Sequence, residues 1–520
     1  MKTPTTIYSI IIFWAIVFLT IKQASKKIIT SNKSTPASTN NKYYKYTAFI
    51  LTTLTIIFYS TINYLAFHSI SVFNRDFPSN IQVIWKLSQN LKPITTIFHF
   101  HMIENHWTLI YFPLALIYKL FPHPLLIAFI TILTFASGAL LIYLIAEKKL
   151  KNPKLSLALL ISLLLNPYVF QGLLLRINSD IFSFFFISLA FYFLIAKENT
   201  TKNNLLFIAS SLAAMSCKED ISLYFIVIGF WILLSLKRKN LGITTLLISG
   251  LYFTFITNLM PNFSIGLRAN NFHITYAHLG SSFPEIIKSI LTNPSLIIKQ
   301  IISPTATISL IHLLAPILPL IFFASSTLFL CLLPILVKIL SNKTYIIGFT
   351  HHHIWHPLFF IYLSAIWGTN NIIKKFKSKP NINKIIVLSV LTASIINLLY
   401  WSNFPIYEYG SFYPISHHLP SERSKKKLAA LSLVPSTASI LADTEFLTYS
   451  PNRATMYELN RFNNETIPQI LNKIDYCILD SKNLNKDKYL KKNKPALKSQ
   501  LKQNKFKLIF SEDGIEVFKK

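Results

Sequence analysis

Long apolar segments separated by short polar loops fill the chain as far as Tyr400. Runs of about 18 or more apolar residues are typical of helices that cross a membrane, and we predict about twelve such helices. The segments expected to cross are 6–21, 46–67, 125–146, 155–174, 181–196, 205–215, 223–236, 241–259, 296–313, 315–340, 358–371 and 385–400.

Lysine-rich loops set the expected orientation of these segments. Because loops rich in Lys and Arg stay in the cytoplasm, we place the linker before Tyr46 and the cluster Lys148–Lys154 there. The segment 107–121 is short for a full crossing and would put that cluster outside, so we expect it to lie in the outer interface. The lysine-rich loops then share one side of the membrane, and the loops carrying Asp76 and Asp180 share the other.

Composition agrees with a membrane protein, since 52% of the residues are hydrophobic and 14% are charged. The formal net charge of +31 would suggest nucleic-acid binding in a soluble protein. Here most lysines lie in loops between apolar segments, where topology explains them, and we expect no nucleic-acid partner. The three cysteines, Cys217, Cys331 and Cys477, lie far apart and show neither a zinc spacing nor a disulfide framework.

The pattern divides the chain into three parts. Residues 1–45 hold the first apolar segment, with no small-residue cleavage site after it, and a lysine-rich cytoplasmic linker. Residues 46–401 form an α-helical, multi-pass membrane domain with an outer loop at 68–123. Residues 402–520 are polar, with short β-branched runs between turns, which predicts a small α/β domain outside the membrane. Near the C-terminus, FKLIF and IEVF look like a closing pair of strands.

The outer loop places ionisable residues between membrane segments, which is a common mark of a functional site. Arg75 and Asp76 come first in this loop. A carboxylate held there could take the proton of an acceptor hydroxyl as the hydroxyl attacks an anomeric carbon. The plainer alternative is that Asp76 pairs with Arg75 or caps a helix that begins near Ser79.

Glu104 and His106 follow in the same loop, close to His99 and His101. Imidazole and carboxylate groups at this spacing can bind a metal ion, orient an acceptor or act as a second acid or base. His-x-His alone is a weak metal signal, and interfacial side chains with ordinary hydrogen bonds are more common. We assign no metal ligand and no cofactor, and a divalent metal stays an open alternative.

Three cations stand in other outer loops. Arg176 precedes Asp180 at the start of a predicted helix, Lys218 and Glu219 form the tip of a short helix hairpin, and Arg268 lies in a later loop. Fixed cations stabilise a departing phosphate, so we group the three as a candidate phosphate clamp. Neutralisation of Lys218 by its acidic neighbours is an equally good account.

A run of histidines precedes a late apolar segment. The run resembles a metal-binding tract, but Trp355 and the segment after it favour an ordinary interfacial belt. A substrate-facing role for one of these histidines is the alternative. The run comprises His351, His352, His353 and His356.

The order of these motifs resembles that of a large family of polytopic membrane proteins of unknown function, itself similar to the GT-C glycosyltransferases. The resemblance covers nearly the whole chain, and its specificity lies in the order of short motifs. The matching features are Asp76 with Gln82 and Trp85, Asn105-His106 with Leu120-Phe121-Pro122, Ser179-Asp180, Lys218-Glu219-Asp220, the segment of His353, and the C-terminal pattern VPSTASILAD…IDYCILD.

The resemblance implies a GT-C-like glycosyltransferase in the cell membrane. It would move a sugar from a polyprenyl-phosphate carrier to a lipid, glycan or protein acceptor on the outer face, with Asp76 as the base. Its partners would be the lipid bilayer and the lipid-linked sugar donor. The chain has Ile81 where the family often has a second Asp, and Asn178 where it often has His. From the loops and the resemblance together, the candidate substrate-binding residues are Arg75, Gln82, Glu104, His106, Arg176, Asp180, Lys218, Glu219, Arg268 and His353.

Two other classes of function remain open. A transporter or lipid flippase would carry ionisable residues in the middle of its helices and would contain internal repeats. The chain has few charges within its apolar segments and no convincing repeat, which counts modestly against this class. A non-catalytic envelope assembly protein, whose outer domain binds partners, is the third alternative.

Overall fold

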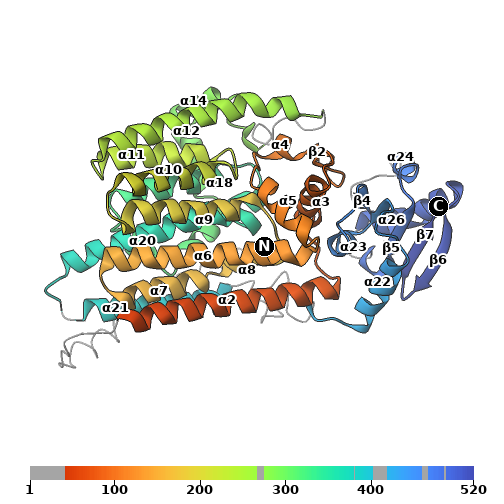
Figure 1. The fold of residues 1–520 in the computed structure, drawn as a ribbon, viewed down its shortest axis with the longest axis horizontal. Helices are drawn as coiled ribbons and strands as arrows, with labels where there is room; N and C mark the ends of the chain where they lie inside the picture. Colours follow the sequence, from red (N-terminus) through yellow and green to blue (C-terminus); the bar gives the residue numbers. More distant parts are fainter. Residues whose placement is uncertain (1–40, 266–274, 380, 402–417, 460–466, 485–487) are drawn as a thin grey trace.

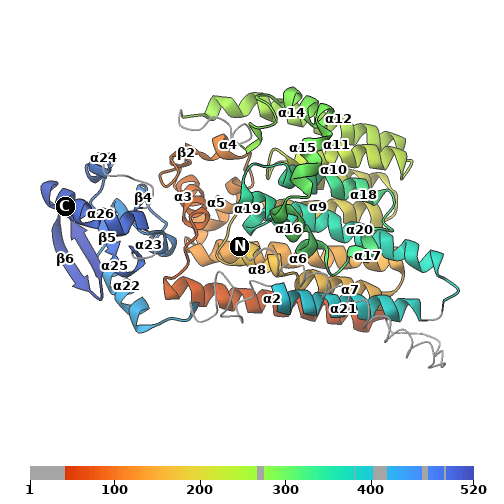
Figure 2. The ribbon, with the colours of Figure 1, turned by 180° about the vertical axis from the view of Figure 1, so that it is seen from behind.

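The computed structural model describes residues 41–265, 275–379, 381–401, 418–459, 467–484 and 488–520, which are mostly helical. The long helices run side by side, and a smaller unit built on a β-sheet lies beyond one end of them (Figure 1, and Figure 2 from behind). The first predicted span, 6–21, and most of the linker after it lie outside the described residues.

The elements of the helical part follow one another along the chain as far as residue 401. Two of them are very short strands of the outer loop, and the rest are helices. They are α2 (Asn41–Ser69), α3 (Asp76–Ser88), β1 (Ile94–Thr95), β2 (Phe100–His101), α4 (Met102–Asn105), α5 (Tyr111–Leu120), α6 (Pro124–Leu150), α7 (Pro153–Leu164), α8 (Pro167–Leu173), α9 (Ser179–Phe191), η1 (Tyr192–Ala196), α10 (Thr201–Met215), α11 (Ile221–Leu234), α12 (Lys239–Leu259), η2 (Met260–Phe263), α14 (Phe283–Thr292), α15 (Pro294–Ile301), α16 (Pro304–Leu314), α17 (Leu318–Ile321), α18 (Thr327–Ile339), α19 (Thr344–Ile347), η3 (His351–Ile354), α20 (Trp355–Lys375) and α21 (Ile382–Trp401).

Among the described residues, 5 helices are long and apolar enough to cross a membrane, and up to 7 spans result if two bent pairs count as one span each. The five correspond to α2, α6, α9 with η1, α12 with η2, and α21. The helices α5, α11 and α18 are apolar but shorter. Residues 107–121, which we expected to lie in the interface, contain only the 10-residue α5. The number of about twelve crossings stays a prediction.

A bend after α7 interrupts one predicted span. The helices α7 and α8 meet at 53°, where Asn166 caps α8 and Pro167 opens it. The backbone beyond α8 takes its partners from α2, since Asn63 donates to the Leu173 carbonyl at 3.0 Å and accepts from the Leu175 amide at 2.8 Å. A buried backbone group without a partner is costly, so this single side chain stabilises the turn between α8 and α9.

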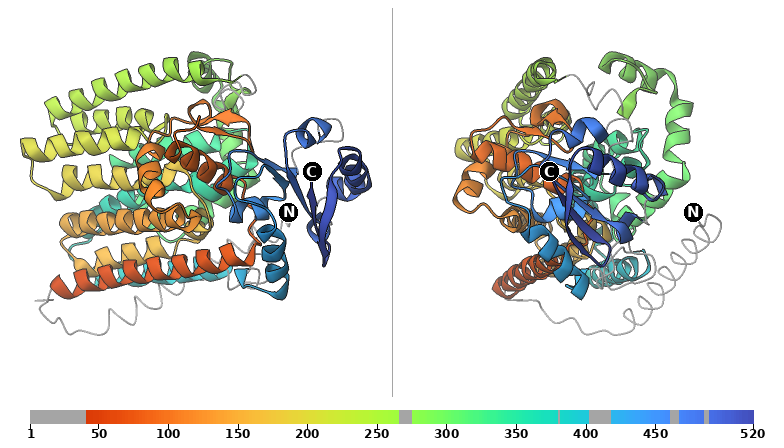
Figure 3. Two further views of the ribbon diagram at one scale, coloured as in Figure 1. Left: turned by 45° about the vertical axis from the view of Figure 1, so that its right-hand side comes forward. Right: turned by 90° about the vertical axis from the view of Figure 1, so that its right-hand side faces the viewer.

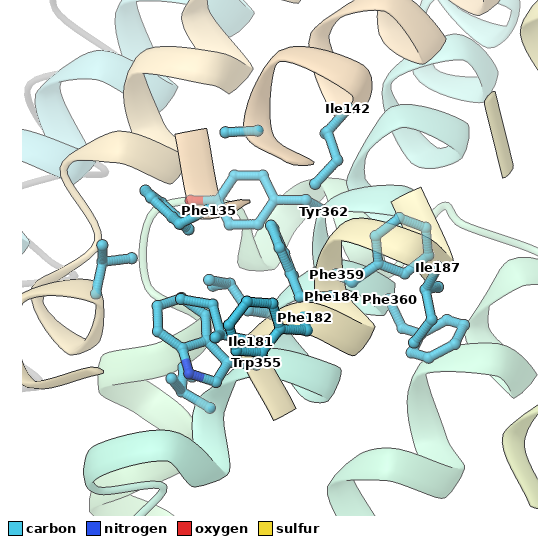
Figure 4. Packing of buried hydrophobic residues seen from close by; sticks show 14 of the residues in the cluster. Phe135, Ile142, Ile181, Phe182, Phe184, Ile187, Trp355, Phe359, Phe360 and Tyr362 are labelled. Atoms are coloured by element: carbon cyan, nitrogen blue, oxygen red, sulfur yellow. The ribbon is translucent and has the colours of Figure 1, made fainter. Parts of the chain in front are cut away.

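Aromatic side chains pack at the centre of the bundle (Figure 4). Trp355, fully buried at the start of α20, has its ring centroid 5.4 Å from that of Phe135 and 5.9 Å from that of Phe184. Gly172 of α8 leaves room for the indole, because a Cβ at that position would overlap it. The short helix η3 ends immediately before Trp355, so this packing also fixes the position of η3.

The C-terminal unit, coloured blue in Figure 3, contains a mixed five-stranded sheet. Its strand order is β4-β3-β5-β7-β6. β3 pairs in parallel with β4 and with β5, whereas β7 pairs antiparallel with both β5 and β6. The residues of β3, β4 and β5 are all buried, as is usual for parallel strands. The elements are α22 (Glu422–Ser432), β3 (Ile440–Ala442), α23 (Thr444–Tyr449), β4 (Met456–Glu458), α24 (Ile467–Leu471), β5 (Tyr476–Asp480), α25 (Ser481–Leu484), α26 (Lys488–Gln503), β6 (Lys507–Glu512) and β7 (Ile515–Lys519).

The outer loop lies between the helical bundle and the sheet (Figure 1). Its helix α3 packs against α5 on one side and against α23 of the C-terminal unit on the other. The Tyr118 hydroxyl of α5 donates to the Asn452 side chain at 2.6 Å. The loop is therefore held by both parts of the molecule.

The close approach of α17 and α20 at Gly368 gives a test of the packing. A Cβ at Gly368 would overlap the Leu320 carbonyl oxygen, which moves only with its backbone. We expect Gly368→Ala to lower the free energy of unfolding by about 1–3 kcal/mol, measured by thermal unfolding in detergent. Gly250→Ala in α12 is the matched control, since its Cβ meets nothing within 4 Å. Equal losses in both variants would contradict this packing.

Candidate functional site

Asp76 is the first residue of α3. Its backbone amide donates to the Asn74 side chain at 3.1 Å, and the Asn74 amide group donates to the Leu175 carbonyl at 2.7 Å. The helix thus begins three residues before Ser79, where the sequence suggested a start. A carboxylate in the first turn is favoured by the helix dipole, and Asn74 ties this turn to the segment between α8 and α9.

The histidine tract reaches Asp76 through His352. The His352 Nδ1 atom lies 4.0 Å from Asp76 Oδ2, and the two side chains are 13% and 38% exposed. His353, the histidine chosen from the sequence, is buried behind His352, with the two ring centroids 4.1 Å apart. Within the tract, it is therefore His352 that lies beside the candidate base.

A buried ion pair joins the start of α9 to the tip of the α10–α11 hairpin. Lys218 Nζ donates to Asp180 Oδ1 at 2.9 Å and lies 3.9 Å from Asp220. Lys338 at the end of α18 lies 3.7 Å from the same Asp220 carboxylate. The Lys218 and Asp180 side chains are 5% and 1% exposed, so each charge depends on the other for its stability inside the protein.

His356 of α20 contacts the buried Asp180 carboxylate. Its Nε2 atom lies 3.6 Å from Asp180 and 2.7 Å from the Ser183 hydroxyl. On the other side of the hairpin tip, the Tyr224 hydroxyl donates to Asp220 at 3.2 Å. Side chains from α9, α11, α18 and α20 thus converge on the Lys218 tip.

Glu219, the residue after Lys218, binds the outer loop. Its carboxylate lies 2.8 Å from His106 Nδ1 and accepts from the Trp107 amide at 3.0 Å. Burial alone would raise the pKa of Glu219, but the interaction with His106 holds it below its ordinary value. Leu109 also donates its amide to the Ser216 carbonyl at 3.0 Å. These contacts attach the hairpin tip to the loop that carries Asp76.

Glu104 and the nearby His106 bind different partners. Glu104 forms a capping box with His101 and accepts hydrogen bonds from Ser264 and from the Ile265 amide. His106 turns to Glu219 as described above. Across the described ranges, no group of three or more His, Cys, Asp or Glu side chains has the arrangement that would hold a metal ion.

Gln82 and Arg75 face the C-terminal unit. The fully buried Gln82 amide donates to Thr96 at 2.8 Å and to the Arg453 carbonyl at 3.1 Å. Arg75 Nε donates to Glu458 of β4 at 2.7 Å. Both residues were candidates for substrate binding from the sequence, and these contacts favour a structural role for Gln82.

Two further cations, Arg176 and Arg268, were candidates for phosphate binding from the sequence, and only Arg176 lies among the described residues. Arg176 is buried on the segment between α8 and α9. Arg268 lies outside the described residues. Sequence reasoning gave no role to Lys338, although an isolated lysine at the end of an apolar helix is itself a signal of function or of a buried ion pair.

The carboxyl ends of the parallel strands bring further buried charges toward the same loop. Asp443 follows β3, Glu458 ends β4 and Asp480 ends β5, and all three are buried. Lys427 of α22 lies between Glu445, in α23, and Asp480, which lies 3.6 Å from it. Burial and the neighbouring Glu445 and Asp480 raise the pKa of Asp443 to about 8, an effect that Lys427 partly offsets.

Removal of one partner of the Lys218 ion pair should be strongly destabilising. Lys218→Met leaves two buried carboxylates without this cation, and we expect a loss of about 3–5 kcal/mol in the free energy of unfolding. Thermal unfolding in detergent measures the loss, with Lys202→Met at an exposed position of α10 as the control. The double variant Asp180→Asn with Lys218→Met should lose less than Lys218→Met alone. A double variant that loses the full sum of the single changes would contradict the coupling.

The raised pKa of Asp443 predicts that the stability of the protein depends on pH. Because its pKa is higher in the folded protein than in the unfolded chain, its contribution is complete below about pH 4 and is lost as the pH rises to about 8. We expect Asp443→Asn to make the melting temperature less sensitive to pH between pH 6 and about 8.5 and to raise it at the alkaline end. Glu512→Gln, at an exposed carboxylate of β6, should keep the wild-type dependence. A wild-type-like slope in Asp443→Asn would contradict the assignment.

Comparison with known proteins supports the architecture. No curated protein sequence matches the chain. Two solved structures of ArnT from Cupriavidus metallidurans, a GT-C glycosyltransferase, share 10% sequence identity with it. The structure bound to undecaprenyl phosphate covers 90% of this chain and 97% of its own, with a TM-score of 0.50. The apo structure covers 91% and 98%, with a TM-score of 0.52. At this identity the likeness is one of fold.

Residues 58–517 match the family described as "Predicted membrane protein (DUF2079)". This match spans most of the 520 residues. It includes the outer loop, the helical bundle and nearly all of the C-terminal sheet. The chain belongs to the DUF2079 family of predicted membrane proteins.

Proposed function

We propose that this protein is a glycosyltransferase of the cell membrane, with Asp76 as the catalytic base. It would transfer a sugar from a polyprenyl-phosphate carrier to a lipid, glycan or protein acceptor on the outer face. The ArnT-like fold supports the class, and one of the ArnT structures contains undecaprenyl phosphate. A donor of this kind enters from the bilayer, which suits a site at one end of a membrane bundle.

The exposure of Asp76 among the carboxylates of this site carries the assignment of the base. Its side chain is 38% exposed, compared with 23% for Glu219, 17% for Asp220 and 1% for Asp180. A general base must reach the acceptor hydroxyl directly or through one water molecule. The more buried carboxylates are held by Lys218, Lys338 and His106, so they suit structural roles better.

The phosphate of the donor needs cations to balance its charge, and the three candidate cations suit different roles. Lys218 is already bound by Asp180, so it would hold the hairpin tip in place and would add a positive field only from a distance. Arg176, a buried guanidinium on the segment between α8 and α9, is a second candidate for phosphate binding. A guanidinium group binds phosphate with two parallel hydrogen bonds. Arg268 remains a candidate from the sequence.

The orientation of the site follows from the same proposal. Asp76, Asp180 and Lys218 would face the outer side of the membrane, because the lysine-rich loops mark the cytoplasmic side. The contacts that join Asn74 to Leu175 and Asp180 to Lys218 support a shared location for the three loops. The C-terminal sheet, which contacts the Asp76 loop through Arg75 and Glu458, would lie on that side too.

Asp76→Asn tests the base. The change keeps the size of the side chain and removes its ability to accept a proton, so we expect transfer to fall by about 10²–10⁴-fold. The measurement is the incorporation of label from polyprenyl-phosphate sugars into lipid, glycan or peptide acceptors, with purified protein in liposomes. Glu422→Gln, at an exposed carboxylate of α22, is the control and should keep full activity.

Other outcomes discriminate between the classes of function. Full transfer by Asp76→Asn, at normal expression and membrane insertion, would remove the assignment of the base. No transfer by the wild-type protein, together with movement of labelled lipid across the liposome membrane, would favour a transporter or flippase instead.

A further inference from the structure

Arg75 binds the C-terminal sheet at the edge where α/β sheets commonly bind their ligands. Such sheets bind ligands just outside the carboxyl ends of their parallel strands. Here β3 and β4 end in register, since Ala442 pairs with Glu458, and β5 continues past Ile478, the other partner of Ala442, to Asp480. Arg75 enters at this edge and donates its Nε to Glu458 at 2.7 Å. A side chain of the outer loop thus binds at the usual ligand position.

Glu458 is well suited to hold a cation at a fixed point. Its side chain is 0% exposed, and it also accepts a hydrogen bond from the Thr444 hydroxyl. Removal of a carboxylate from water is costly unless it is paired and hydrogen-bonded. Arg75 supplies the pairing charge, so the position of the guanidinium is set by a rigid, buried acceptor on β4.

Further contacts hold the loop on both sides of Arg75. Before it, the Ile70 carbonyl accepts from Lys427 and the Ser69 carbonyl accepts from Ser424, both in α22. After it, Thr96 exchanges two hydrogen bonds with the backbone of Met456 in β4, at 2.7 and 2.9 Å. The C-terminal unit therefore contacts the chain at each end of the segment that contains Asp76.

Arg75 is the residue directly before α3, and Asp76 is the first residue of that helix. A shift of Arg75 must change the start of the helix, because the Arg75 carbonyl accepts the Ser79 amide in the first turn. The position of the Asp76 carboxylate relative to His352 depends on the same turn. A misplacement of about 1 Å at a reacting group can reduce a rate by about 100-fold.

We propose that Glu458 and Arg75 form a positioning pair, by which the C-terminal sheet fixes the Asp76 carboxylate for proton abstraction. This inference rests on the proposed function and deepens it, since it makes the C-terminal sheet part of the catalytic apparatus. Neither residue contacts the reacting atoms in this scheme. Both act through the first turn of α3.

The test compares Arg75→Ala, Arg75→Lys and Glu458→Gln with the wild-type protein in the liposome transfer assay. Arg75→Ala leaves the buried Glu458 carboxylate without its cation, so circular dichroism first establishes that each variant is folded. We expect Arg75→Ala and Glu458→Gln to lower kcat by about 10- to 100-fold, with the KM for the polyprenyl-phosphate sugar changed by less than about twofold. Arg75→Lys, which keeps the charge, should recover part of kcat.

Two controls separate positioning from general loosening of the interface. Asn452→Ala removes the hydrogen bond to Tyr118 in the same interface, away from Arg75, and should leave kcat unchanged. The double variant Arg75→Ala with Glu458→Gln should be no less active than the worse single variant, because the two residues act as one unit. Hydrogen exchange of residues 76–88, followed by mass spectrometry, should quicken in Arg75→Ala and not in Asn452→Ala.

The outcomes distinguish the two proposals. If the wild-type protein transfers no sugar, the proposed function fails, and hydrogen exchange alone decides whether the pair orders α3. Unchanged exchange in Arg75→Ala would overturn the positioning pair whatever the activity. A rise in KM with normal kcat would also overturn it, since that result would make Arg75 a donor-binding residue.

Discussion

The buried ion pair of Lys218 and Asp180 constrains the whole site. Neither charge is stable inside the protein without the other, so the start of α9 and the tip of the α10–α11 hairpin must meet. Once they meet, Glu219 next to Lys218 is in reach of His106 and Trp107, and the outer loop becomes attached to the bundle. A single electrostatic requirement thus links three loops that lie far apart in the sequence.

The outer loop joins the helical bundle to the C-terminal unit. On the bundle side its partners are backbone carbonyls between α8 and α9, which Asn74 and Asn80 bind at 2.7 and 2.6 Å. On the other side its partners are buried charges at the edge of a mixed sheet. Asp76 stands between these two sets of contacts and keeps an exposed side chain. This combination of a firmly held backbone and an accessible carboxylate is what a general base requires.

The sequence predicted the helical class, and which loops lie near one another, better than it predicted the hydrogen-bond and ion-pair partner of each side chain. Apolar length and loop charge predicted that Asp76, Asp180 and the 218–220 tip share one side, and the contacts from Asn74 to Leu175 and from Asp180 to Lys218 bring these loops together. The pairing of Lys218 with Asp180 rather than with Glu219 could not be read from spacing, because it depends on how α9 packs against α10. The burial of Gln82 could not be read from the sequence for a similar reason, since it depends on contacts with Arg453 in the C-terminal unit. Lys338 was overlooked because its partner, Asp220, is distant in sequence.

The amide of Asn63 also bears on how the chain assembles. Its partners, Leu173 and Leu175, are separated from it by 110 and 112 residues. The Leu173 carbonyl and the Leu175 amide lie at the end of α8, where the helix no longer supplies their partners, so both depend on this one side chain. α2 precedes α8 in the order of synthesis, so the side chain that binds residues 173 and 175 is made before them. The position of the later turn is therefore set by a helix that comes earlier in the chain.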